Sequence, residues 1–90
     1  MADRSTDGPF QYRPEIIETL WRYGIHPTSE TRPELVREFV SDLYRHEIRC
    51  LRERLLKNEF PKREYAARVE ALRNRYQVLS LLPHQLVGPP

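Results

Sequence analysis

Apolar residues at helical spacing begin soon after the start of this chain. Pro14 suits the first turn of a helix, because the backbone N–H that proline lacks would be unpaired there in any case. Gly24 is a natural end, since glycine readily takes the left-handed conformation that closes many helices. The pattern predicts a short helix over about residues 14–23, with the apolar positions Ile16, Ile17, Leu20 and Trp21.

A second and longer helix is predicted over about residues 32–57. Thr31 and Glu34 have the spacing of a capping box, in which the threonine caps the helix and the glutamate reaches back to the cap. Acidic residues fall early in this segment and arginines fall late, an order that agrees with the helix dipole. Projection at about 100° per residue gathers one apolar arc from Val36, Phe39, Val40, Leu43, Cys50 and Leu51.

The third predicted helix covers about residues 61–82. Its apolar positions alternate at steps of four and three, as in the seam of a coiled coil, and they are Tyr65, Val69, Leu72, Tyr76 and Leu79. The connection around Asn58 and Pro61 is short, so the second and third helices should lie antiparallel as an αα-hairpin.

The fold class that follows is all-α: an antiparallel helical hairpin with a short additional N-terminal helix, three helices in total. We expect residues 1–12 to form a flexible arm, residues 13–82 the helical domain, and residues 83–90 a C-terminal tail. The first helix should pack across one end of the hairpin.

Composition narrows the class of protein further. A chain of 90 residues has room for one small domain of marginal stability, which favours help from a partner chain. The net charge of +2 is too small to imply nucleic acid by itself. A single cysteine excludes an internal disulfide, and no apolar run is long enough to cross a membrane. We therefore expect a cytoplasmic protein that does not bind membranes.

Glu47 falls near the centre of the apolar arc of the second helix. An ionised carboxylate in such a place needs a compensating partner. That partner could be Arg54 on the same helix, an arginine of the third helix such as Arg73 or Arg75, a metal ion, or another subunit. We predict a buried ion pair and take Arg54 as the first candidate.

The third helix changes character at Val78, because apolar residues surround its axis from there to Leu82. A helix that is apolar on all sides must be covered on all sides. Either the first helix and the tail close over this end within the chain, or a second chain covers it, and the sequence leaves both alternatives open.

The side chains of His46, Glu47 and Cys50 have the spacing of a partial helical metal site. A catalytic zinc ion usually needs three protein ligands, and neither His26 nor His84 lies in a supporting motif. No base is evidently placed to activate Cys50, and three glycines leave little material for a phosphate-binding loop. The sequence therefore predicts no catalytic residue, no metal and no cofactor, and a protein that is not an enzyme.

Three arginines recur on the outer side of the second helix, opposite the apolar arc: Arg45, Arg49 and Arg52, the arginine stripe. Such a stripe could follow a phosphate backbone, or it could meet an acidic protein surface. The nearly balanced total charge favours the protein surface, since a dedicated nucleic-acid binder usually carries a larger basic excess.

The function predicted from these features is a small non-catalytic protein–protein interaction or assembly module. It would self-associate or dock as an accessory subunit of a larger complex. The alternatives are a nucleic-acid-associated helical factor that contacts phosphates through the arginine stripe, and a metal site formed between two copies around Glu47. The residues predicted to bind a protein partner are Trp21, Tyr23, Arg45, Arg49, Arg52, Val78, Leu81 and Leu82.

Overall fold

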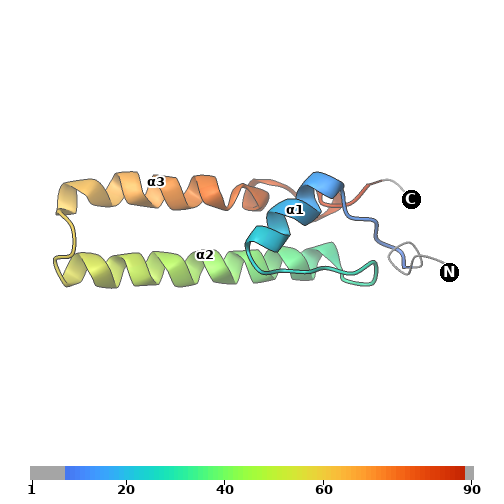
Figure 1. Ribbon diagram of the computed structural model, residues 1–90, viewed down its shortest axis with the longest axis horizontal. Helices are drawn as coiled ribbons and strands as arrows, with labels where there is room; N and C mark the ends of the chain where they lie inside the picture. The colour runs from blue at the N-terminus through green and yellow to red at the C-terminus, as the bar shows by residue number, and fades with distance from the viewer. Residues whose placement is uncertain (1–7, 89–90) are drawn as a thin grey trace.

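A computed structural model describes residues 8–88 as an all-α protein. Its α-helices are α1 (Pro14–Arg22), α2 (Pro33–Leu56) and α3 (Tyr65–Arg75), and α2 and α3 form the predicted antiparallel hairpin (Figure 1). Short 3-10 turns extend the third segment at both ends: η2 (Lys62–Glu64), η3 (Gln77–Ser80) and η4 (Pro83–Gln85). The molecule is elongated, with extents of 55 × 19 × 17 Å. In the described part of the chain, no helix combines the length and the apolar character that crossing a bilayer requires.

The helix boundaries follow from proline, glycine and asparagine at particular positions. Pro14 and Pro33 are the first residues of α1 and α2, and Gly24 closes α1 with a φ of 84°. Asn58 turns the chain at the tip of the hairpin with a φ of 61°, a conformation that asparagine tolerates better than most residues.

The capping box predicted at the start of α2 does not form. The N-cap residue is Arg32, without a side-chain cap, and the hydroxyl of Thr31 instead accepts the backbone N–H of Thr28 at 2.9 Å. Thr31 therefore stabilises the preceding turn, because its side chain has already found a donor there. Pro33, the first residue of α2, therefore determines where this helix begins.

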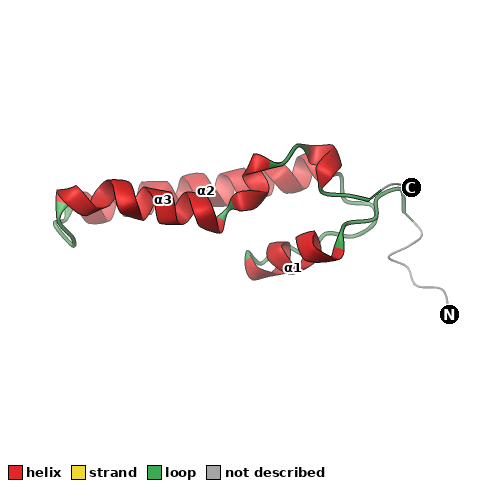
Figure 2. Cartoon of the chain, turned by 90° about the horizontal axis from the view of Figure 1, so that it is seen from above, coloured by secondary structure: helices red, strands yellow, loops and turns green. Residues whose placement is uncertain are grey.

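The hydrophobic core lies at the end of the hairpin that also holds the described termini. Figure 2 shows α1 beside this end only. Four side chains there have no exposed surface: Leu20, Val36, Val40 and Leu86. They come from α1, α2 and the C-terminal tail, so the first helix and the tail close over this end within the chain.

The third helix is shorter than the predicted range of 61–82. It ends at Arg75, and Tyr76 leaves the helical conformation with φ −105° and ψ 48°. The break turns Val78 inward, where it is 3% exposed. The backbone carbonyls that follow are paired by Arg37 of α2, whose guanidinium donates to Leu79 at 2.8 Å and to Leu81 at 3.1 Å. Tertiary hydrogen bonds therefore replace helical ones at this point of the chain.

The described part of the predicted N-terminal arm, residues 8–12, lies against the C-terminal tail. Tyr12 pairs with Val87 in an isolated antiparallel bridge, and the backbone N–H of Gly88 donates to Gln11 at 2.8 Å. The Tyr12 side chain is 9% exposed, and its hydroxyl donates to the carbonyl of Thr31. The remainder of the predicted arm, residues 1–7, and residues 89–90 of the predicted tail lie outside the described residues.

The other half of the hairpin, residues 48–75, is named here the free end. Both views show only α2, α3 and their connection in it (Figures 1 and 2). Leu51 and Phe60 are its buried residues. The free end is therefore a single layer of two helices, whereas the core end has a third helix packed on it.

Candidate functional site

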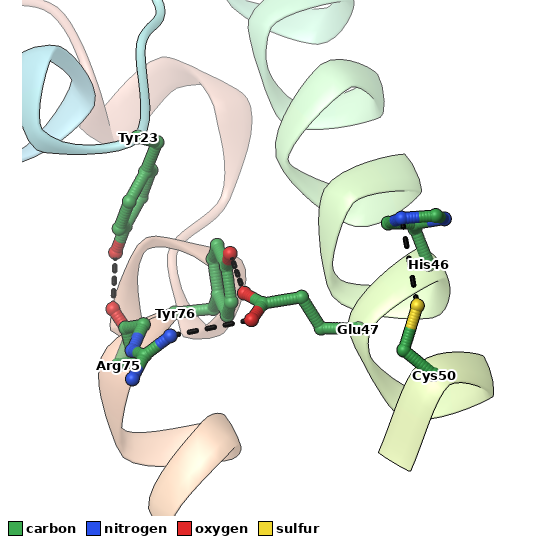
Figure 3. Close-up of polar contacts among 6 residues, drawn as sticks. All are labelled: Tyr23, His46, Glu47, Cys50, Arg75 and Tyr76. Atoms are coloured by element: carbon green, nitrogen blue, oxygen red, sulfur yellow. Dashed lines mark hydrogen bonds and ion pairs between the residues drawn. The ribbon is translucent and has the colours of Figure 1, made fainter. Parts of the chain in front are cut away.

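Glu47 is compensated from α3, and Arg54 is not its partner. Arg75 donates through Nη1 to Oε1 of Glu47 at 3.2 Å, and the Tyr76 hydroxyl donates to Oε2, as Figure 3 shows. Arg54 lies seven residues further along α2, about 10.5 Å away at 1.5 Å per residue. Its Nε donates to Glu59 at 3.1 Å, beyond the end of the helix. The predicted ion pair of Glu47 with Arg54 is therefore wrong in its partner.

The cluster of Glu47, Arg75 and Tyr76 is half-open to solvent. The side chain of Glu47 is 31% exposed and that of Arg75 is 61% exposed, so this ion pair is not fully buried. Tyr76 is the inner member, with 7% of its surface exposed. Burial, the hydrogen bond to Glu47 and the negative charge of Glu47 raise the pKa of Tyr76 to about 12. Tyr76 is therefore a neutral hydrogen-bond donor at physiological pH.

Tyr23 connects this cluster to α1. Its ring lies 4.7 Å from the ring of Tyr76, measured between centroids, and its hydroxyl donates to the backbone carbonyl of Arg75 (Figure 3). Burial is the largest cause that raises the pKa of Tyr23. These contacts give Tyr23, which was predicted to bind a partner, a role inside the chain.

His46 and Cys50 lie on the side of Glu47 that faces away from Arg75 and Tyr76, and they contact each other. The Sγ of Cys50 is 3.6 Å from Nε2 of His46, as expected for residues one helical turn apart. No group of three or more His, Cys, Asp or Glu side chains within residues 8–88 is arranged to hold a metal ion. In a single chain these two side chains therefore make a local contact and supply at most two ligands.

A groove of about 430 Å³ runs between α2 and α3 past these residues. Three arginines line it: Arg54, Arg68 and Arg75. Each is paired with a carboxylate, since Arg54 bonds Glu59 at 3.1 Å, Arg68 bonds Glu64 at 3.1 Å and Arg75 bonds Glu47 at 3.2 Å. The groove therefore has no unbalanced positive charge with which to attract a phosphate.

The other residues predicted to bind a partner differ in their exposure to solvent. Trp21 and Leu82 are both 57% exposed, whereas Leu81 is half-buried. Val78 belongs to the core and is not accessible. The three residues of the arginine stripe, Arg45, Arg49 and Arg52, are all exposed. The structure does not gather these residues on one face, since Val78 is internal and the stripe lies on the outer side of α2.

The sequence analysis missed the hydroxyl of Tyr76, which it counted only as an apolar seam residue. A signal for it existed, because an antiparallel hairpin that turns near Pro61 places Glu47 and Tyr76 at nearly equal distances from the turn. The sequence analysis also missed the burial of Leu86. The tail is too short to show a helical periodicity from which that burial could have been predicted.

A comparison of this chain with protein-family models, with curated proteins and with solved structures found no match.

Proposed function

We propose that this protein is a non-catalytic assembly module, which docks on a protein partner through the free end of its hairpin. The observation that carries the proposal is incomplete burial along that end. Only Leu51 and Phe60 are buried there, while five other apolar residues of α2 and α3 are no more than half-buried, namely Ile48, Leu55, Tyr65, Val69 and Leu72. Two helices cannot cover an apolar seam on both sides, and a third or fourth helix from a partner would complete the packing.

The tip of the hairpin offers an apolar contact next to this seam. A depression there is lined by Leu55, Leu56 and Phe60, and Leu56 is 76% exposed. Single exposed leucines are common on protein surfaces, but one that continues a half-buried seam extends the apolar area a partner can cover. The neighbouring charged side chains, such as Lys57 and Lys62, would form the polar rim usual for an interface.

The proposal is tested by capture of partners from the native host on the immobilised full chain, with two matched variants. Leu56→Glu places a charge at the tip, where its exposure leaves room for the new side chain. Leu82→Glu makes the same change at the core end, at a leucine that is also exposed. A docked partner should be captured by the parent and by Leu82→Glu, and lost with Leu56→Glu.

Two results would contradict the proposal. One is a set of captured proteins that is identical for the parent and for Leu56→Glu. The other is nucleic acid that co-purifies with the chain, is seen as a raised ratio of absorbance at 260 and 280 nm, and disappears when Arg45, Arg49 and Arg52 are replaced by Gln. The latter result would support the nucleic-acid alternative, because it would assign the arginine stripe to phosphates.

A further inference from the structure

We infer that a second copy of this chain binds antiparallel along the outer face of α2, through six charged residues whose order is self-complementary. The inference rests on the proposed assembly role and assigns it a second surface, the outer face of α2, which is distinct from the seam and the tip through which the free end is proposed to dock. The six residues are Glu34, Glu38, Asp42, Arg45, Arg49 and Arg52, named here the charge stripe.

The charge stripe is a narrow and continuous feature of one helix. At about 100° per residue its six members fall within an arc of roughly 80°, on the side of α2 opposite the buried Val40 and Leu51. All six side chains are exposed. Figure 1 shows α2 along one long edge of the molecule, with α3 on its other side. A second helix can therefore approach this face.

The order of charges along the stripe makes it complementary to itself. Its first three members are acidic and its last three are basic, and they are placed almost symmetrically about a midpoint between Leu43 and Tyr44. An antiparallel copy with its two-fold axis at that midpoint sets Glu38 level with Arg49 and Asp42 level with Arg45 along the helix axis. The same operation sets Glu34 opposite Arg52, with an offset of about 1.5 Å, the rise of one residue. Each contact occurs twice, so six unlike pairs form and no like charges meet.

Only two of the six charges form an ion pair with each other inside the described chain. Asp42 and Arg45 form an exposed ion pair at 3.3 Å. Glu38, Arg49 and Arg52 make no ion pair with any residue from 8 to 88. The unpaired charges of the stripe are therefore available to a second copy. Asp42 and Arg45 would exchange their present ion pair for the same residues of that copy.

The helix dipole does not account for the whole pattern. Its influence on side-chain charge is confined to the first and last turns of a helix. The sign of the stripe changes between Asp42 and Arg45, in the middle of the 24-residue α2, where the dipole has little effect. An antiparallel partner accounts for that central change of sign, because it places an opposite charge beside each charge of the stripe.

Apolar side chains border the stripe and would supply packing. Leu35 is 40% exposed and Phe39 is 46% exposed, and both lie on the same flank of α2. In a two-fold arrangement this flank of each copy lies beside the same flank of the other. Phe39 would then reach the alkyl stem of Arg49 in the second copy, a contact that arginine makes readily with aromatic rings.

Sedimentation equilibrium of the full chain tests the inference. The mass should rise from 10.8 kDa towards twice that value with increasing concentration in 0.1 M salt. In 1 M salt the association should weaken by at least about tenfold, because the screening length falls from about 10 Å to about 3 Å. A chain that stays monomeric in both salts, or a dimer that ignores salt, would overturn the inference.

Single charge reversals identify the register. Glu38→Arg and Arg49→Glu should each raise the dissociation constant by about tenfold or more, since each reversal places like charges together twice. An equimolar mixture of the two variants should associate like the parent, because every Glu38→Arg site then faces an Arg49→Glu site. The double variant in one chain should also associate like the parent. Failure of the mixture to associate, with both variants folded by circular dichroism, would refute this register.

A matched control reverses a charge off the stripe. Glu70→Arg on the exposed side of α3 changes the net charge as Glu38→Arg does, and should leave the association unchanged. Monomeric behaviour of the parent would refute the pairing of α2 but would leave capture by the free end intact. Loss of capture with normal pairing would refute the proposed docking instead, so the two failures are distinguishable.

Discussion

Replacement of Leu86 by alanine tests how far the C-terminal tail belongs to the core. The Leu86 side chain has no exposed surface, while its backbone accepts the N–H of Arg13 at 3.2 Å and donates to Pro83 at 3.1 Å. Alanine keeps both backbone bonds and removes only the buried side-chain atoms. A buried Leu→Ala change typically reduces the free energy of unfolding by about 2 to 5 kcal/mol.

That loss is large for a chain of this size, whose total stability should be about 5 to 13 kcal/mol. Each kcal/mol shifts the melting temperature of a small domain by about 4 to 8 °C, so Leu86→Ala should melt at least about 8 °C below the parent. Thermal melting followed by circular dichroism at 222 nm measures this difference. Leu82→Ala is the matched control, because Leu82 is 57% exposed and its loss should change stability by less than about 0.5 kcal/mol. Equal melting temperatures for Leu86→Ala and the parent would refute the placement of the tail in the core.

Further predictions concern the polar contacts. Glu47→Leu should reduce the free energy of unfolding in urea by about 1 to 3 kcal/mol, because it leaves the buried hydroxyl of Tyr76 without its acceptor, whereas Glu47→Gln keeps an acceptor and should cost less. Since the folded pKa of Tyr76, about 12, lies above the ordinary value of 10.0, its contribution to stability is complete below pH 10 and is lost as the pH rises to 12. Between pH 10 and pH 12, the free energy of unfolding should fall more steeply with pH for the parent than for Tyr76→Phe, by about 1.4 kcal/mol per pH unit. Gly8→Ala should lower the melting temperature, because an added Cβ would lie 2.3 Å from the carbonyl oxygen of Ser29, and an unchanged melting curve would place Gly8 elsewhere.

The starts of α1 and α2 could be predicted because proline at the first position is a local signal. Pro14 and Pro33 restrict the backbone whatever the rest of the chain does. The hairpin could also be predicted, since two periodic helical segments joined by a short turn pack most simply as antiparallel neighbours. Local chemistry therefore determined most of the secondary structure.

The end of α3 could not be predicted, because it depends on residues far away in sequence. The chain leaves the helix at Tyr76, where Arg37 of α2 pairs the carbonyls of Leu79 and Leu81 and the core receives Val78. The apolar pattern does change at Val78 in the sequence, but apolar residues on all sides of a helix axis indicate a covered helix and not a break. Tertiary contacts here overcame helical propensity.

The partner of Glu47 was mistaken for a related reason. Helical projection identified the carboxylate as unusual, and it is indeed half-buried with two hydrogen-bond donors. Projection of one helix cannot say which residues of the facing helix lie at the same height. The same projection counted Phe39 in the apolar arc, but Phe39 is 46% exposed because the true seam is rotated towards Tyr44, which is half-buried and packs against the core.

Amide hydrogen exchange along the hairpin tests the central claim most directly, namely that the free end lacks packing which a partner supplies. The full chain is measured alone in 1 M salt, where pairing of the charge stripes is suppressed. Amides of α2 and α3 in residues 48–75 should exchange at least about tenfold faster than those of α2 near Val36 and Val40, after correction for intrinsic rates. Protection of the free end equal to that of the core end would contradict the claim, because it would show that two helices suffice.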